Sequence, residues 1–299
     1  MTPTLRLRGQ ERVIDTTLVM GVVNASPESF SDGGRFHTIH AQRDHAASLI
    51  EAGADIVDIG GQSAVTNQPE LEAEHELERV LPLVEWVRAT YPGTLISIDT
   101  YKPLVASATL TAGADIVNDV SGLRNPELAG LCADSGAALV IMHTAAPPKV
   151  RRQDPSLYAD VSLEVRDSLA ERMAVAKDAG LPPTSIIVDP GPDFTKTPKQ
   201  TIDLLRSLAP IRALERPLLL ALSRKDFLGA ITGRTPAQRD AATMAAIAYF
   251  AATPGNIVRV HDVAAAVDVI AVVETMEGRR DLAADYLLSD DLRYERTGD

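Results

Sequence analysis

Eight short, mostly apolar runs recur along this chain, and each run stops at a polar or charged residue. Such runs are typical of strands that are buried on both faces of a parallel sheet. They cover residues 18–23, 54–59, 95–98, 116–117, 138–142, 186–188, 218–222 and 256–260. Segments with a helical pattern separate the runs, for example at 38–52 and 70–89. This alternation over about 250 residues predicts an α/β fold, a (β/α)8 TIM barrel in a single domain.

The two ends of the chain differ from this repeating part. Residues 1–17 are short and polar, and they predict an N-terminal segment or β-ribbon that closes one end of the fold. Residues 18–278 carry the eight runs and make up the predicted barrel domain. Residues 279–299 are rich in charge and are expected to form a C-terminal tail. No composition shift within residues 18–278 indicates a second domain.

Composition limits the partners that such a chain can have. A net charge of −12 argues against a surface that binds nucleic acid or an anionic membrane. The single cysteine, Cys132, excludes an intramolecular disulfide and a cysteine-rich metal site. No stretch approaches the roughly 18–20 apolar residues of a spanning helix, and the N-terminus lacks the apolar core of a signal peptide. A cytoplasmic location is therefore expected.

The polar residues that end the runs are the candidates for a ligand site, because the carboxyl ends of parallel barrel strands surround one mouth. These residues are Asn24, Asp58, Asp99, Asn118, His143, Asp189, Ser223 with Lys225, and Arg259 with His261. Asp, Asn and Lys can bind the donor and acceptor edge of a flat heterocycle. The cations after the last two runs lie where barrels often hold phosphate. The pattern predicts a small-molecule heterocycle that carries phosphate or pyrophosphate.

Several motifs make this prediction more specific. They read MGVVNASPESFSDGG at 20–34, DIVDIGG at 55–61, IDTYKP at 98–103, NDVSG at 118–122, MH at 142–143, DPG at 189–191, SRK at 223–225 and RVH at 259–261. With these motifs in this order, the chain resembles the dihydropteroate synthase family over nearly its whole length. The resemblance implies condensation of 6-hydroxymethyl-7,8-dihydropterin pyrophosphate with 4-aminobenzoate in folate biosynthesis, by a homodimer that uses Mg²⁺.

The resemblance also implies which residues bind the pterin. Asp99, Asn118, Asp189 and Lys225 would hold the ring. Asp99 would in addition stabilise the electron-poor pterin methylene as the pyrophosphate departs, because a carboxylate beside developing positive charge lowers its energy.

The pyrophosphate would be held by a second set of residues, Asn24, Arg259 and His261, with Asn24 also binding the metal. By the same resemblance, the catalytic residues would be Asp99, Lys225 and Asn24. Cations beside a leaving anion favour its departure, so this set suits a transferase that releases pyrophosphate.

The chain departs from the family pattern in the pocket for the amine acceptor. After Gly60-Gly61, the family has Glu-Ser-Thr-Arg-Pro-Gly where this chain has QSAVTN at 62–67. The family's Ile-Gly-Phe-Gly-Lys-Thr is PDFTKT at 192–197, and the Ser that follows the lysine of SRK is an aspartate. The altered acceptor pocket would comprise Ala64, Val65, Asp193, Phe194 and Asp226.

These changes predict an intact pterin site beside an altered acceptor site. An acid at 226 would repel the carboxylate of aminobenzoate by on the order of 1 kcal/mol. One alternative is a paralogue with a different, neutral or cationic amine acceptor, or with little synthase activity. Another is that neighbouring residues neutralise the new acids and restore the site. A pterin-dependent methyltransferase acting with a corrinoid partner is the remaining alternative.

Overall fold

The computed structural model describes residues 2–25, 38–62 and 69–294. Eight parallel strands close into a barrel in the order β10-β3-β4-β5-β6-β7-β8-β9, which confirms the predicted (β/α)8 fold. The strands are β3 (Leu18–Asn24), β4 (Ile56–Gly60), β5 (Leu95–Asp99), β6 (Ile116–Asp119), β7 (Ala138–Met142), β8 (Ile186–Asp189), β9 (Leu218–Leu220) and β10 (Asn256–Val260).

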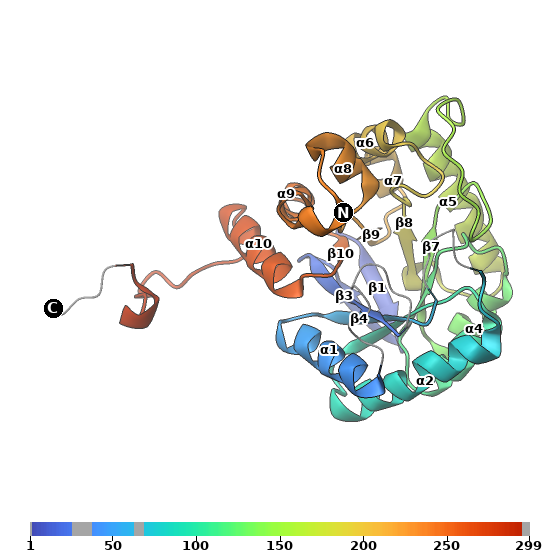
Figure 1. Cartoon of the computed structure of the whole chain (residues 1–299), viewed down its shortest axis with the longest axis horizontal. Helices are drawn as coiled ribbons and strands as arrows, with labels where there is room; N and C mark the ends of the chain where they lie inside the picture. The colour runs from blue at the N-terminus through green and yellow to red at the C-terminus, as the bar shows by residue number, and fades with distance from the viewer. Residues whose placement is uncertain (1, 26–37, 63–68, 295–299) are drawn as a thin grey trace.

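Helices follow the strands and surround the barrel (Figure 1). They are α1 (Ile39–Glu51), α2 (Ala73–Thr90), α3 (Pro103–Thr111), α4 (Glu127–Ser135), α5 (Val161–Asp178), α6 (Pro198–Arg206), α7 (Ala209–Arg212), α8 (Asp226–Thr232), α9 (Asp240–Ala251) and α10 (Val263–Met276). Local sequence sets several of their starts. Thr38, Asp160 and Asp262 cap α1, α5 and α10 by accepting backbone N–H groups of the first turn.

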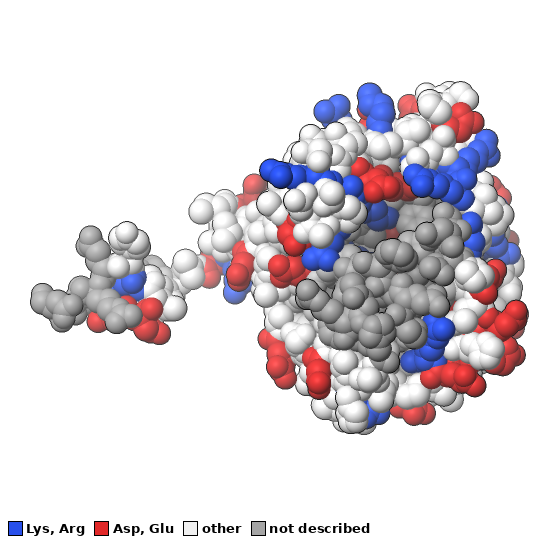
Figure 2. Space-filling view, viewed as in Figure 1, with Lys and Arg blue, Asp and Glu red and all other residues white. Residues whose placement is uncertain are grey.

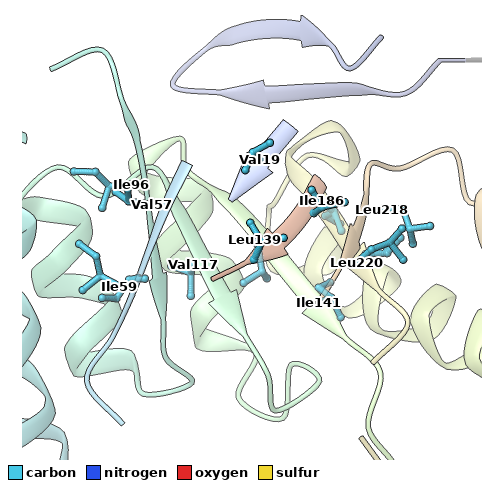
Figure 3. Packing of buried hydrophobic residues seen from close by; sticks show 14 of the residues in the cluster. Val19, Val57, Ile59, Ile96, Val117, Leu139, Ile141, Ile186, Leu218 and Leu220 are labelled. Carbon is cyan, nitrogen blue, oxygen red and sulfur yellow. The ribbon is translucent and has the colours of Figure 1, made fainter. Parts of the chain in front are cut away.

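Alternate residues of each strand enter two separate apolar clusters, as the two-residue period of a strand requires. The outer cluster lies between strands and helices, and Figure 3 labels some of its members from Val19 to Leu220. The inner cluster fills the lower barrel with Leu18, Met20, Ile56, Ile116, Ala138, Val140, Ile187, Leu219 and Ile257. Each polar residue that ends a strand on the inner face therefore points into the barrel above this apolar floor.

A two-stranded antiparallel sheet, β1 (Thr4–Leu7) and β2 (Gln10–Val13), covers the amino-terminal end of the barrel. Leu5 and Ile14 belong to the inner cluster and are almost fully buried. An ion pair joins this sheet to the barrel, since Arg8 Nε lies 2.8 Å from Asp115 Oδ1. The other carboxylate oxygen of Asp115 accepts the Ile96 N–H at 2.8 Å.

Two elements differ from the sequence prediction. The run at 218–222 forms a strand only as far as Leu220, because the chain then turns, with Lys225 N donating to Leu222 O at 3.3 Å. Helix α2 begins at Ala73 and not at residue 70. Residues 70 and 71 are instead held by side chains that follow the neighbouring strands β4 and β5: Tyr101 Oη donates to Glu70 Oε1 at 2.9 Å, and Leu71 N donates to Gln62 Oε1.

The end of the described chain leaves the barrel. After α10, residues 277–294 extend away from it (Figure 1). Within the described residues, no helix combines the length and the hydropathy that are needed to cross a membrane.

The position of Leu5 gives a stability prediction. Leu5→Ala should lower the free energy of unfolding by about 2–5 kcal/mol, because it leaves a cavity under the barrel floor. Val13→Ala on the same sheet is the matched control, since Val13 is 53% exposed, and it should cost less than about 0.5 kcal/mol. Urea unfolding followed by circular dichroism measures both. Equal effects of the two variants would contradict the role of this sheet as part of the core.

Candidate active site

A cavity of about 890 Å³ opens at the carboxyl end of the strands. Its lining includes Gln62, Asp99, Tyr101, Phe194, Lys225 and Arg259. Further lining residues come from the segment 147–153 after β7 and from 235–237. In the view of Figure 2, Lys and Arg side chains are interspersed with Asp and Glu side chains over the described surface. Among the described residues that line the cavity, Lys149, Arg151, Arg152, Arg224, Lys225 and Arg259 are cationic, and Glu76, Asp99, Asp193 and Asp226 are acidic.

A network of ion pairs crosses the barrel interior. Arg259 Nε lies 2.6 Å from Asp58 Oδ2, and Arg259 Nη2 lies 3.0 Å from Asp99 Oδ2. Asp58 is fully buried and also accepts the Ser97 hydroxyl at 2.6 Å. Removing one partner would leave a buried charge, so each group depends on the others. The network holds the Asp99 carboxylate at the cavity wall.

Asn118 lies next to Asp99 in the register of β5 and β6. Its Nδ2 donates to Asp58 Oδ2 at 3.2 Å, so its Oδ1 is the atom left to face other groups. Among the described residues, Asn118 Oδ1 is buried and has no hydrogen-bond donor. A buried acceptor without a partner costs about 1–3 kcal/mol, and a ligand N–H would recover that energy.

Asp189 ends β8 on the inner face and is 3% exposed. Its Oδ1 accepts the Gly191 N–H at 2.7 Å. Burial raises the pKa of Asp189, while the Lys225 charge opposes that shift. Burial also raises the pKa of Asp99, to about 7, against the effect of the Arg259 charge. Both carboxylates thus lack full solvation and would gain from N–H donors on a ligand.

Lys196 organises the loop that follows β8. It is fully buried, and its Nζ contacts Gly191 O and Phe194 O at 3.0 Å each and His143 Nδ1 at 2.8 Å. These two carbonyl oxygens and the His143 ring nitrogen are the polar partners of the Lys196 amine. Burial lowers the pKa of Lys196 to about 7, and burial with the Lys196 charge lowers that of His143.

The same loop positions Lys225. Lys225 Nζ donates to Pro192 O at 2.7 Å and lies 4.4 Å from the centroid of the Phe194 ring. Burial lowers the pKa of Lys225, and the charges of Asp193 and Asp189 oppose this shift. Lys225 is thus held between the loop after β8 and the inner face of the barrel.

Ser223 and His261 contribute a second polar group on the cavity wall. Ser223 Oγ lies 2.9 Å from His261 Nδ1, and both line the cavity with Arg259. Asn24 ends β3 on the same inner face as Met20, and neither it nor Asn118 nor Asp189 is among the described residues that line the cavity.

The residues expected to form the altered acceptor pocket divide into two groups. Asp193, Phe194 and Asp226 line the cavity with Lys225. Ala64 and Val65 lie outside the described residues. Each of the two acids has a partner within the protein: Asp193 Oδ2 accepts the Phe227 N–H at 3.2 Å, and Asp226 Oδ1 lies 3.1 Å from Arg239 Nη1.

The sequence places Asp58 and His143 among the candidates for the ligand site but gives them no specific role, and it does not single out Lys196 or Arg239. The two-residue period of a strand predicts that Asp58 points into the barrel, because Ile56 lies on the same face and belongs to the inner cluster. Nothing in the local sequence predicts the contact of Lys196 with His143, 53 residues away, or the pairing of Arg239 with Asp226, 13 residues away.

The structure limits how a metal could bind. No group of three or more His, Cys, Asp or Glu side chains among the described residues could hold an ion. Mg²⁺ commonly keeps several waters and binds through few protein ligands together with substrate phosphates. An amide oxygen such as that of Asn24 is a hard donor of the kind that suits a cation held mainly by pyrophosphate and water.

Comparison with known proteins agrees with this geometry. The family described as "Pterin binding enzyme" matches residues 20–261. A dihydropteroate synthase of Streptococcus pyogenes serotype M6 is 40% identical over 261 residues, which cover 86% of this chain and 95% of the relative.

Solved structures agree as well. The dihydropteroate synthase of Xanthomonas albilineans with 4-aminobenzoic acid has a TM-score of 0.83 and 38% identity, and the match covers 93% of this chain and 99% of the other. The Burkholderia cenocepacia enzyme complexed with 7,8-dihydropteroate has a TM-score of 0.80 and 36% identity, with 93% and 97% covered. Fold, motif order and sequence identity over most of both chains all point the same way: this chain belongs to the dihydropteroate synthase family of pterin-binding enzymes.

Proposed function

We propose that the protein transfers the pterin methylene of 6-hydroxymethyl-7,8-dihydropterin pyrophosphate to an amine. This is the type of reaction that the name of its relatives, dihydropteroate synthase, describes. The observation that carries this proposal is the single cavity in which Asp99, Lys225, Arg259 and His261 meet. The relatives favour this reaction over corrinoid-dependent methyl transfer.

The pterin ring would bind to the inward-facing carboxyl and amide groups. Asp189 would accept two N–H groups from the guanidine-like edge of the ring, a charge-assisted arrangement. Asn118 Oδ1 would accept a further N–H in place of the partner that it lacks among the described residues. Lys225 would donate to a ring acceptor from the rim of the cavity.

The pyrophosphate would lie towards Arg259, His261 and Asn24. Arg259 uses only part of its five-donor guanidinium on Asp58 and Asp99, so it has N–H groups left for an oxyanion.

In the reaction, the methylene C–O bond breaks, pyrophosphate takes the electron pair, the amine nitrogen bonds to the methylene, and the amine loses a proton. Asp99 would stabilise the positive charge that develops on the pterin.

Asn24 is the residue that we propose as the ligand of Mg²⁺. An amide oxygen is a hard donor of the kind that Mg²⁺ prefers, and the ion would neutralise charge on the leaving pyrophosphate.

We also propose a homodimeric, cytoplasmic protein. Neighbouring helices α8, α9 and α10 expose large apolar side chains, which are Ile231, Tyr249, Val272 and Met276. Exposed apolar groups on adjacent elements are typical of protein interfaces. The single cysteine, Cys132, is buried and free, which suits a reducing compartment.

The first test measures pterin binding and turnover. Calorimetry should show binding of the pterin pyrophosphate, and Asn118→Val should weaken it at least roughly tenfold, because a buried hydrogen bond is lost. Amine-dependent release of pyrophosphate measures the transfer. Thr111→Ala is the control and should bind normally, because Thr111 is exposed at the end of α3 and does not line the cavity. Failure of the wild-type protein to bind the pterin pyrophosphate would overturn the proposal.

A second test uses pH. Because the pKa of Asp99 is raised to about 7, the carboxyl is protonated below that pH and accepts fewer N–H groups. Affinity for 6-hydroxymethylpterin, which has no phosphate to titrate, should fall by up to about tenfold per pH unit below pH 7. Asp99→Asn should remove this dependence. The same slope in both proteins would assign the titration to another group.

A third test addresses the dimer. Tyr249→Glu places a charge in the exposed apolar patch and should shift the protein towards monomer in analytical ultracentrifugation. Leu104→Glu is the control, because Leu104 is similarly exposed on α3 but lies on the opposite side of the barrel. A wild-type protein that is monomeric at micromolar concentration would contradict the homodimer.

A further inference from the structure

The loop between β8 and α6, residues 190–197, contains three residues with a left-handed backbone. Gly191, Asp193 and Thr195 have φ of 64°, 63° and 53°. This conformation is strained for a β-branched residue such as Thr195, and strained backbone persists only where surrounding contacts fix it. The contacts that hold this loop therefore determine where its carbonyl groups and side chains lie.

Lys196 supplies contacts at the centre of the loop. Its side chain is fully buried, and its Nζ lies 3.0 Å from Gly191 O and 3.0 Å from Phe194 O. The third partner of this amine is His143 Nδ1, at 2.8 Å, from the segment after β7. Burial of an amine is costly unless it is hydrogen-bonded, so the two carbonyl groups and the ring are held around one point.

Two residues that are proposed above to bind the pterin ring, Asp189 and Lys225, contact this loop. Asp189 Oδ1 accepts the Gly191 N–H at 2.7 Å. Lys225 Nζ lies 4.4 Å from the centroid of the Phe194 ring. Gly191 and Phe194 are also the residues whose carbonyl groups Lys196 binds. One buried amine therefore fixes both positions that orient these pterin-binding side chains.

The packing at Gly191 leaves the start of the loop little room to shift. A Cβ atom there would meet His143 O at 2.1 Å and Lys196 Nζ at 3.4 Å. The backbone of β8 is also fixed at this point, because His143 N donates to Asp189 O at 2.8 Å. Burial raises the pKa of Asp189, and the charges of Lys225 and Lys196 oppose this rise. Lys196 thus affects both the position and the charge of Asp189.

We propose that Lys196 is a positioning residue for the pterin site, and that it sets the affinity for the pterin by fixing the loop that orients Asp189 and Lys225. This inference rests on the pterin binding proposed above. Lys196 acts through those two residues, because its own amine is turned towards the loop and His143. A lysine that served only the stability of the fold would leave the pterin affinity unchanged, and this difference can be measured.

The test compares Lys196→Met with a matched control, Arg88→Met. Methionine keeps much of the length of either side chain and removes its N–H groups. Arg88 also binds backbone carbonyl groups, those of Pro92 at 2.8 Å and Gly113 at 2.9 Å, but it does so at the amino-terminal end of the barrel. Both variants should lower Tm. In calorimetry with 6-hydroxymethylpterin, Lys196→Met should raise Kd roughly tenfold or more, and Arg88→Met should leave Kd unchanged.

A second pair of variants tests the His143 contact and decides the matter if Lys196→Met does not fold. His143→Leu removes the ring nitrogen that lies next to Lys196, whereas His143→Asn keeps a polar atom close to that place. His143→Leu should raise Kd for 6-hydroxymethylpterin by roughly three- to tenfold, because the amine loses a partner and the loop is held less firmly. His143→Asn should retain most of the affinity.

The outcomes separate this inference from the proposed function. If the wild-type protein binds the pterin and Lys196→Met folds with a lowered Tm but an unchanged Kd, Lys196 serves only the fold and the inference is wrong. Equal affinities of His143→Leu and His143→Asn would overturn it as well. Absence of pterin binding by the wild-type protein would overturn the proposed function, and this inference with it.

Discussion

The alternation of side chains along a strand is the constraint on which this structure depends. In a closed parallel barrel, every second residue points inward, and the strand ends lie around one mouth. Met20, Ile56, Ile116 and Ile187 fill the lower interior, and the polar residues two or four positions further on follow them on the same face. The inward-facing side chains of the same strands therefore form both the apolar floor and the polar residues above it.

Ion pairs and hydrogen bonds stabilise the buried charges of this layer. Arg259 joins Asp58 to Asp99 across the barrel, and Asp58 is further stabilised by Ser97. The arrangement leaves Asp99 at the cavity wall with a raised pKa. Such a carboxyl responds to a ligand that brings N–H donors, since those donors replace the solvation lost on folding.

The loops after β8 and β9 decide how the wall around Lys225 is built. Lys196 binds three acceptors at once and holds Phe194 in the position from which it contacts Lys225. Asp193 and Asp226 then connect this wall to α8 and Arg239. Asp99, Lys225, Arg259 and His261 therefore meet the two acids at one cavity.

The sequence alone determined the barrel, because eight apolar runs with helical segments between them fit few other folds. It also placed Asp99, Asn118, Asp189 and Arg259 at strand ends, since strand period and direction are local properties. Only the tertiary structure decided how the charges pair. Arg259 pairs with Asp58, Lys196 contacts His143 and Arg239 pairs with Asp226, at separations of 201, 53 and 13 residues, and no local pattern encodes these three contacts. Two acids that looked unpaired in the sequence thus have partners in the fold, because their neighbours are set by packing and not by proximity along the chain.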